Sequence, residues 1–194
     1  MVHTAASQQG TRPKPRYPSR HTRSRHRGRQ DRWRTSQRRP RRDWHERRNG
    51  VHDDVHDVLV RNSEEYIVSC GDGLYRTRDG GQYWTRLDGG LSHRYFREAI
   101  EHDGRLYTAA ARSSPGTWSG ESGADAGLFI SDDDGDSFRA VSYPGKPHEV
   151  VLAWAVVDDH VIEGTHDGRV LRETSGTWET VGQLPTGIRS LCAL

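Results

Sequence analysis

The sequence predicts an all-β fold made of repeated four-stranded antiparallel units. Two observations support this prediction. From residue 51 onward, short apolar segments alternate with turns rich in Gly and Asp, and no window has the periodicity of an amphipathic helix. In addition, one short motif recurs at the same place in successive units.

Each unit is expected to begin with an apolar segment of strand length, of which the run Val150–Val157 is the longest. First strands are expected at Val55–Val60, Phe96–Glu101 and Leu152–Val157, with one extra strand at Ile188–Leu194. Second strands are expected at Tyr66–Ser69, Leu106–Ala110 and Val161–Gly164. The chain therefore contains about three units and one further strand.

The third and fourth strands of each unit flank the recurring motif. Third strands are expected at Leu74–Thr77, Leu128–Ser131 and Arg169–Glu173, and fourth strands at Trp84–Leu87, Phe138–Val141 and Trp178–Val181. The motif reads Ser/Thr-x-Asp-x-Gly-x-x-aromatic, at Thr77, Asp79, Gly81 and Trp84 and again at Ser131, Asp133, Gly135 and Phe138. The third unit lacks it, with Arg172 and Thr174 in place of the Ser/Thr and the Asp.

The motif residues are expected to build a tight turn. Asp side chains in turns accept hydrogen bonds from nearby backbone N–H groups, which is the role we expect for Asp79 and Asp133. Gly81 and Gly135 would supply the positive φ that the turn needs. The aromatic residue that ends each motif would then pack into the core. All of these roles are structural.

The spacing of the units favours a propeller-like architecture. The glycines that precede the third strands, Gly73, Gly127 and Gly168, are 54 and 41 residues apart, and an insertion near Ser113–Asp125 accounts for the longer interval. Four short antiparallel strands repeating at roughly 40–45 residues are the sequence form of a propeller blade. A β-sandwich also has many short strands, but it does not require the same motif in successive units.

The two complete motifs resemble the Asp box of BNR-repeat β-propellers, and residues 51–194 resemble WD40/YVTN/BNR-like repeat proteins. The resemblance implies that the Asp boxes lie on the face opposite the usual ligand site, so Asp79 and Asp133 are not expected to be catalytic. Because propellers typically close with about four to eight blades, the chain looks like the C-terminal part of a larger propeller.

Residues 1–50 are expected to be a disordered, Arg-rich segment outside the 51–194 domain. They contain 16 Lys+Arg and 3 Asp+Glu, a charge of +13, whereas residues 51–194 contain 13 basic and 24 acidic residues, a charge of −11. Such a composition cannot bury enough apolar surface to order itself. Three interpretations stay open: a misplaced start codon in GC-rich DNA, an unspecific solvated tail, or an arm that binds nucleic acid or another polyanion.

A ligand site is expected on the face formed by the loops between second and third strands and between units. These loops gather imidazole, guanidinium and aromatic side chains, as a polar binding site would. The residues expected to bind the ligand are His93, Arg94, Tyr95, Arg112, His148 and His166, with Trp118 and Asp167 nearby. The alternative is that these loops are polar only because surface loops generally are, and that they form no ligand site.

The favoured function is a non-catalytic binding or scaffold module for an unknown protein or a small polar or glycan ligand. The alternative is a fragment of a sialidase-like glycoside hydrolase, because sialidases share this blade type and need an arginine cluster, a Tyr–Glu pair and an acidic Asp. Arg94, Arg97 and Arg112 match by type only. The Phe/Tyr-Arg-Ile-Pro signature is absent, and Tyr95-Phe96-Arg97-Glu98 is a poor substitute.

No cofactor, metal or membrane partner is expected. The Asp132–Asp136 run lacks EF-hand spacing, and His52 and His56 on one strand would stand roughly 13 Å apart. No stretch approaches the ~20 apolar residues of a membrane span, and the N-terminus has no secretory signal. Two lone thiols, Cys70 and Cys192, and an acidic, lysine-poor domain of archaeal-like composition indicate a cytoplasmic protein.

Overall fold

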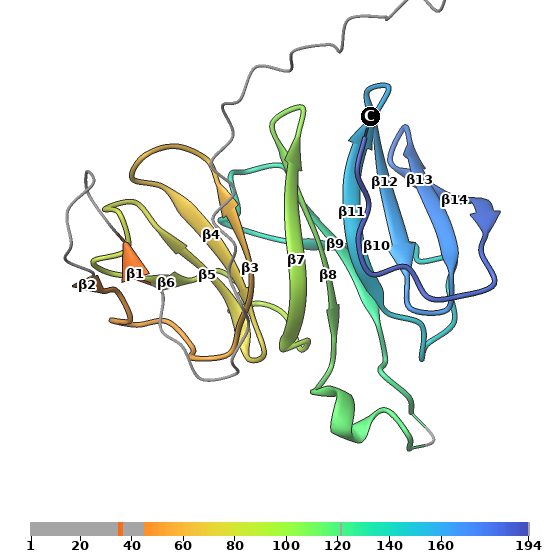
Figure 1. Ribbon diagram of the computed structural model, residues 1–194, viewed down its shortest axis with the longest axis horizontal. Helices are drawn as coiled ribbons and strands as arrows, with labels where there is room; N and C mark the ends of the chain where they lie inside the picture. The colour runs from red at the N-terminus through yellow and green to blue at the C-terminus, as the bar shows by residue number, and fades with distance from the viewer. Residues whose placement is uncertain (1–34, 37–44, 121, 194) are drawn as a thin grey trace, which may run out of the picture.

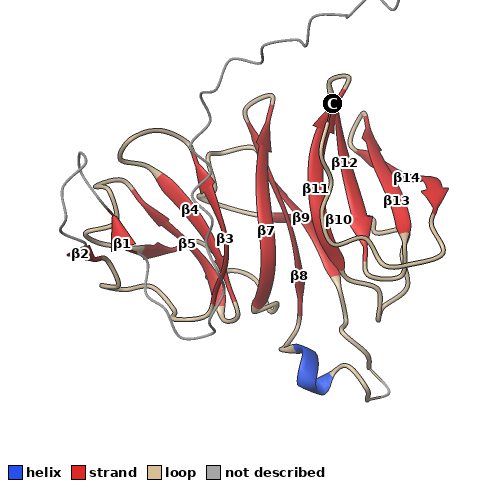
Figure 2. Cartoon of the chain, in the orientation of Figure 1, coloured by secondary structure: helices blue, strands red, loops and turns tan. Residues whose placement is uncertain are grey.

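The computed structural model describes residues 35–36, 45–120 and 122–193. Three four-stranded antiparallel sheets stand side by side, and the all-β, propeller-like fold is confirmed (Figure 1). The only helix in the described part of the chain is a single 3-10 turn at Pro115–Thr117 (Figure 2). No described helix is long and apolar enough to cross a bilayer.

Each sheet is one unit of the predicted repeat, and its strands pair in chain order. Blade 1 contains β3 (Val55–Val60), β4 (Tyr66–Cys70), β5 (Gly73–Thr77) and β6 (Thr85–Arg86). Blade 2 contains β7 (Tyr95–His102), β8 (Arg105–Ala111), β9 (Gly127–Ser131) and β10 (Arg139–Val141). Blade 3 contains β11 (Val151–Val157), β12 (His160–Thr165), β13 (Arg169–Thr174) and β14 (Thr177–Gln183). A two-stranded sheet, β1 (Thr35–Ser36) and β2 (His45–Glu46), precedes them.

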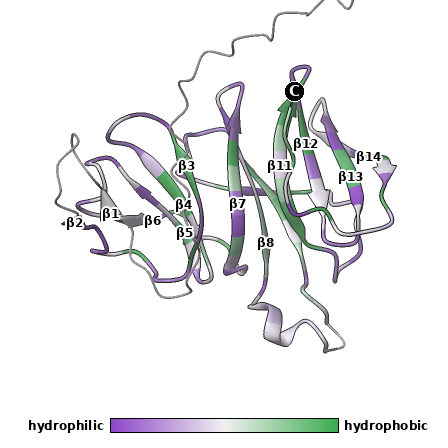
Figure 3. Cartoon of the chain, viewed as in Figure 1, coloured by the Kyte–Doolittle hydropathy of each residue, from purple (hydrophilic) through white to green (hydrophobic). Residues whose placement is uncertain are grey.

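The blades pack face to face through apolar side chains. One buried cluster, which includes Ile67, Leu74, Phe96 and Leu106, joins blades 1 and 2. A second, which includes Tyr107, Ile130, Trp154, Leu171 and Trp178, joins blades 2 and 3. Strand β7 contacts β3, β4 and β11, so the first strand of the middle blade lies between its two neighbours. Figure 3 shows apolar segments along the strands and polar ones at many of the turns.

Both predicted Asp turns contain the expected hydrogen bonds. Asp79 accepts the backbone N–H groups of Gln82 and Tyr83 at 2.8 and 3.0 Å. Asp133 accepts the backbone N–H of Ser137 at 2.8 Å and its hydroxyl at 2.6 Å. The Ser137 hydroxyl and N–H hold the pKa of Asp133 down at about 2. Gly81 and Gly135 have the positive φ values of 87° and 84° that the turns require.

The third blade replaces the Asp turn by a two-residue hairpin. Ser175 and Gly176 both have positive φ, 52° and 85°, and connect the directly paired residues Thr174 and Thr177. This is the backbone of a type I′ turn, whose twist matches that of the flanking strands. Trp178 lies ten residues after Gly168, whereas Trp84 lies eleven residues after Gly73, and the shorter turn accounts for the difference.

The predicted strand at Ile188–Leu194 is wrong for its described residues, since 188–193 form no strand. Ile188 donates its backbone N–H to the carbonyl of Thr165 at 2.9 Å, and its side chain is buried against Gly164. The first strand of a further blade would pair with a second strand of that blade, and the described residues after Ile188 contain no such strand. The fourth strands of blades 1 and 2 also begin one residue later than expected, after the aromatic residue.

The chain before β3 packs against the outward face of blade 1. The indole N–H of Trp84 donates to the carbonyl of Arg47 at 3.1 Å, and its backbone N–H donates to Asn49 at 3.1 Å. Val51 packs on the buried cluster of that face, which includes Val68 and Trp84. Residues 47–51 therefore contact blade 1, and most of the segment expected to be disordered lies outside the described residues.

Candidate functional site

The loops expected to share one face do lie together, and we call this the rim face. It comprises the loops at 71–72, 88–94, 112–126, 142–150 and 166–168. Backbone hydrogen bonds tie neighbouring loops to each other: Gly73 N–H to Arg94, Ala126 N–H to Pro147, and His166 N–H to Val150, at 2.7 to 3.0 Å. The side chains of different blades are thereby held in fixed relation to one another.

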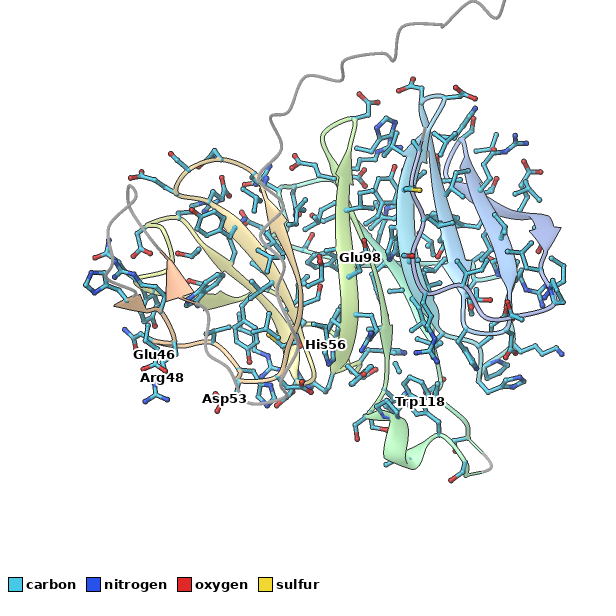
Figure 4. All side chains as sticks on the ribbon, in the orientation of Figure 1. Glu46, Arg48, Asp53, His56, Glu98 and Trp118 are labelled. Carbon is cyan, nitrogen blue, oxygen red and sulfur yellow. The ribbon has the colours of Figure 1, made fainter. Side chains whose placement is uncertain are left out.

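A row of four rings runs across the rim face, with members from all three blades. The centroids of His56 and Tyr95 are 4.8 Å apart, those of Tyr95 and Trp118 are 5.6 Å apart, and those of Trp118 and His166 are 6.4 Å apart. Figure 4 shows His56 and Trp118 toward the same end of the blades. Tyr95 is a buried member of this row, so it supports the site rather than facing a ligand.

Trp118 forms one wall of an open pocket of about 350 Å³ on the rim face. The pocket is lined by Trp118, Gly120, Ser122, Gly123, Pro147 and His148. The indole N–H donates to the carbonyl of Ser113 at 2.8 Å, and the ring meets Tyr95 edge to face at 88°. These two contacts hold the Trp118 ring in one orientation.

Two imidazoles and one carboxylate lie beside this pocket. Nδ1 of His166 accepts the backbone N–H of Val150 at 3.0 Å, so its proton is on Nε2, which lies 3.2 Å from Asp167. The other oxygen of Asp167 is 3.4 Å from Nε2 of His148. Of the predicted residues, His148 and His166 are therefore brought together, and Asp167 joins them.

The predicted arginines of the rim face are engaged in ion pairs within the protein. Arg94 pairs with the fully buried carboxylate of Asp88 at 3.1 Å, as does Arg86 at 2.8 Å. Arg112 pairs with Asp125. These guanidinium groups already have carboxylate partners, and they do not form the arginine cluster that a sialidase-like site needs.

His93 also serves the structure of the loop. Its Nε2 is 2.8 Å from the carbonyl of Asp125, and its ring packs edge-on against Phe129. Burial lowers the pKa of His93, although the hydrogen bond to Asp125 opposes that effect. Together with the buried Tyr95 and the half-exposed Arg94 and Arg112, it holds the rim loops in place.

Glu98, in β7 of blade 2, is a titratable residue that the sequence did not single out, and it lies away from Trp118 (Figure 4). Burial and the negative charge of Asp57 raise its pKa to about 7, and a hydrogen bond from the Trp154 backbone and the charge of Arg97 oppose the rise. Groups from all three blades therefore act on this carboxyl. A carboxyl that titrates near neutrality can donate or accept a proton.

The first strand of every blade contains a register shift near its rim end. The shifts lie between Val55 and Asp57 in β3, between Phe96 and Ala99 in β7, and between Val151 and Ala153 in β11. Bulges of this kind redirect side chains, and they are common next to functional sites. They direct His56 and Glu98 in ways that the two-residue period of a strand does not predict.

His56 has both ring nitrogens next to acceptors. Nδ1 is 2.5 Å from the carbonyl of Phe96, and Nε2 is 3.3 Å from Asp54. His52 instead accepts the backbone N–H of Asp54 at 3.3 Å. No group of three or more His, Cys, Asp or Glu side chains among the described residues is arranged to hold a metal ion.

Comparison with known proteins shows the fold alone. The chain matches no protein-family model and no curated protein. Among solved structures it is similar to the extracellular domain of BT4673 from B. thetaiotaomicron (TM-score 0.57, 14% identity) and to an ancestral GH74 enzyme (TM-score 0.55, 19% identity). These matches cover 74% and 70% of this chain but only 19% of each of those proteins.

A third similar structure, the computationally designed Ika4 protein, has a size close to that of this chain. Its TM-score is 0.51 at 13% identity, and the match covers 75% of this chain and 84% of Ika4. The neighbours are β-propeller-type proteins, which agrees with the three blades described above. The protein therefore has a β-propeller-type fold, and identities this low carry no information about its activity.

Proposed function

We propose that the three blades form a non-catalytic binding module whose ligand occupies the pocket beside Trp118. The supporting observation is the pocket itself, in which an oriented indole ring lies near the His148–Asp167–His166 group. A concave site with an apolar wall and a few convergent polar groups is the general form of a small-ligand site. The ligand would be a small polar molecule or glycan, or a loop of a partner protein.

Binding is tested on the full chain with an array of neutral and sialylated oligosaccharides, followed by titration of intrinsic tryptophan fluorescence. Trp118→Ala is expected to weaken binding roughly tenfold or more, because the wall of the pocket is lost. Tyr83→Ala is the matched control, since Tyr83 is an exposed aromatic residue away from the rim face. Binding that is unchanged in Trp118→Ala would contradict this location of the site.

A second candidate function, glycoside hydrolysis, is favoured by one observation. Glu98 has a pKa of about 7 and lies close enough to Asp57 to feel its charge, as one member of a catalytic carboxyl pair would. Turnover of a panel of aryl glycosides that includes a sialoside is the test. Hydrolysis that disappears in Glu98→Gln would establish this candidate and refute the non-catalytic one.

We further infer that blades 1 and 2 are BNR-type Asp-box repeats of a longer propeller. The hydrogen bonds of Asp79 and Asp133 within their turns support this inference. In-frame Asp-box repeats in the upstream nucleotide sequence would confirm it, and an upstream stop codon with no repeat in any frame would refute it.

We also propose that the protein is cytoplasmic, on the basis of its two lone thiols and its acidic, lysine-poor domain.

Binding of nucleic acid by the basic segment is the remaining alternative, and most of that segment lies outside the described residues. It predicts that affinity for duplex DNA falls steeply with salt. A deletion that tests it should stop at residue 44, because residues 47 and 49 bond to Trp84 in blade 1. Salt-independent binding, or binding that survives the deletion, would exclude the basic segment as the cause.

A further inference from the structure

The outward face of blade 3 has the residue pattern of a contact between blades. Leu171 belongs to the cluster that faces blade 2, so its neighbours in sequence, Val170 and Arg172, point to the opposite side of the sheet. On that side Ile162 is paired with Arg172, and Gly164 is paired with Val170.

The matching positions of blade 1 form the contact with blade 2. Ile67 is paired with Arg76 in the same way, and the next pair in the same register is Ser69 with Leu74. Ile67, Leu74 and Arg76 are all buried there. Arg76 donates to Asp134 and Asp136 in the turn of the next blade. In blade 1, the face that contacts the neighbouring sheet therefore carries an Ile paired with an Arg and, in the next pair, an apolar residue.

In blade 3 the same pattern has no sheet against it among the described residues. Ile162 and Val170 are only half-buried. Arg172 is 41% exposed and pairs with Glu179 of its own sheet at 2.6 Å. The matching residue of blade 1, Arg76, instead bonds to the turn of the next blade. Ile188 lies over Gly164 at the rim end of β12, and the chain after it runs along β11 and β12 toward their opposite end, so the side of the face that carries Val170, Arg172 and Glu179 is the open part (Figure 1).

We propose that this face binds the same face of a second copy of the chain about a two-fold axis. The face is self-complementary, because it carries an apolar centre at Ile162 and Val170 and both members of the Arg172–Glu179 pair. A two-fold axis can place Arg172 of each copy opposite Glu179 of the other. A head-to-tail contact would instead need the outward face of blade 1, which the segment at 45–54 covers.

The test is sedimentation equilibrium of the full chain at up to about 100 µM, since modest homodimers dissociate in the micromolar range. We expect a dimer. Ile162→Lys places a charge in the apolar centre and is expected to weaken the dimer roughly tenfold or more. Val60→Lys is the matched control, because Val60 is an exposed aliphatic residue on blade 1.

A charge exchange gives a second, independent readout on exposed residues. Arg172→Glu is expected to weaken the dimer, and the double variant Arg172→Glu with Glu179→Arg is expected to restore it. Because this ion pair is exposed, these variants should fold even if Ile162→Lys does not. A chain that stays monomeric refutes the proposal and leaves as the occupant a different protein or a further sheet, such as the next blade of the longer propeller inferred above. A dimer indifferent to both changes, or growth beyond two copies, also overturns it.

Discussion

Arg61, which follows β3, and Glu101, in β7, form a two-point ion pair across the contact between blades 1 and 2. Nε of Arg61 donates to one carboxylate oxygen of Glu101 and Nη2 donates to the other, both at 2.8 Å. Arg61 also pairs with Glu65 and with Asp134. The hydrogen bond to Glu101 is the largest cause of a raised Arg61 pKa. One guanidinium thereby connects the two sheets.

Arg61→Ala is expected to lower the free energy of unfolding by about 2 kcal/mol, because it removes the two-point partner of the partly buried Glu101 carboxylate and one of the arginine partners of Glu65 and of Asp134. Urea denaturation at neutral pH measures the change. Arg139→Ala is the control: Arg139 pairs with Asp132 at the surface, where both side chains are half-exposed, and should cost at most about 0.5 kcal/mol. Equal losses in the two variants would show that the Arg61 network adds nothing beyond an ordinary surface pair.

Trp84→Ala is expected to cost roughly 3–5 kcal/mol, because a buried aromatic side chain and its hydrogen bond to Arg47 are lost. The adjacent residue offers a matched control, since Tyr83 is 59% exposed and Tyr83→Ala should change stability by at most about 0.5 kcal/mol. Thermal or urea unfolding of both variants provides the comparison. A small loss in Trp84→Ala would mean that the segment at 45–51 contributes little to the fold.

Glu163 is expected to make stability fall as pH rises. Its carboxyl is fully buried without a hydrogen-bond partner among the described residues, and burial raises its pKa well above 4.5. The unfolded chain loses this proton near pH 4.5, whereas the folded chain keeps it. The stabilisation is therefore complete below that pH and is lost as pH rises through the folded pKa.

Glu163→Gln should remove this dependence, which amounts to roughly 1.4 kcal/mol per pH unit between the two pKa values. Urea unfolding at several pH values gives the difference between the variant and the natural chain. Glu64→Gln, at an exposed position on blade 1, serves as the control. If the difference between natural chain and Glu163→Gln stays constant from acid to alkaline pH, Glu163 does not titrate as described.

The carboxyl carbon of Glu98 is expected to titrate with a midpoint of about 7 in an NMR experiment. Asp57→Asn should lower that midpoint, because it removes a neighbouring negative charge. The midpoint should stay above the ordinary value of 4.5, since burial is the larger cause. Asp53→Asn, at an exposed carboxylate, is the control. A midpoint near 4.5 in the natural chain would remove the support for Glu98 as a proton donor.

The sequence predicted the elements whose causes are local. A strand such as Val55–Val60 follows from its own residues and the turns that bound it, and its predicted bounds are those observed. The turn around Asp79 is equally local, because its donors and acceptors lie within seven residues of one another. Local patterns of this kind account for all twelve blade strands.

Features that depend on other blades could not be predicted in this way. Arg94 and Arg112 look available in the sequence, yet each has a carboxylate partner that only the folded loops bring close. Burial and the charge of Asp57 from one neighbouring blade raise the pKa of Glu98, while the Trp154 backbone of the other neighbouring blade opposes the rise. Ile188 begins an apolar segment of strand length, but among the described residues its backbone bonds to Thr165 alone. These ion pairs, this pKa and this missing strand therefore depend on contacts between residues far apart in the sequence, which a local pattern does not show.

The packing of residues 45–54 on blade 1 gives the protein an internal kinetic reporter. Cys70 is buried there, with its thiol 3.7 Å from the carbonyl of His52, whereas Cys192 is exposed. A thiol reagent can therefore modify Cys192 at once but must wait for the segment to lift before it reaches Cys70. The slower rate would report how often this edge of the molecule opens while the rest of the fold stays intact.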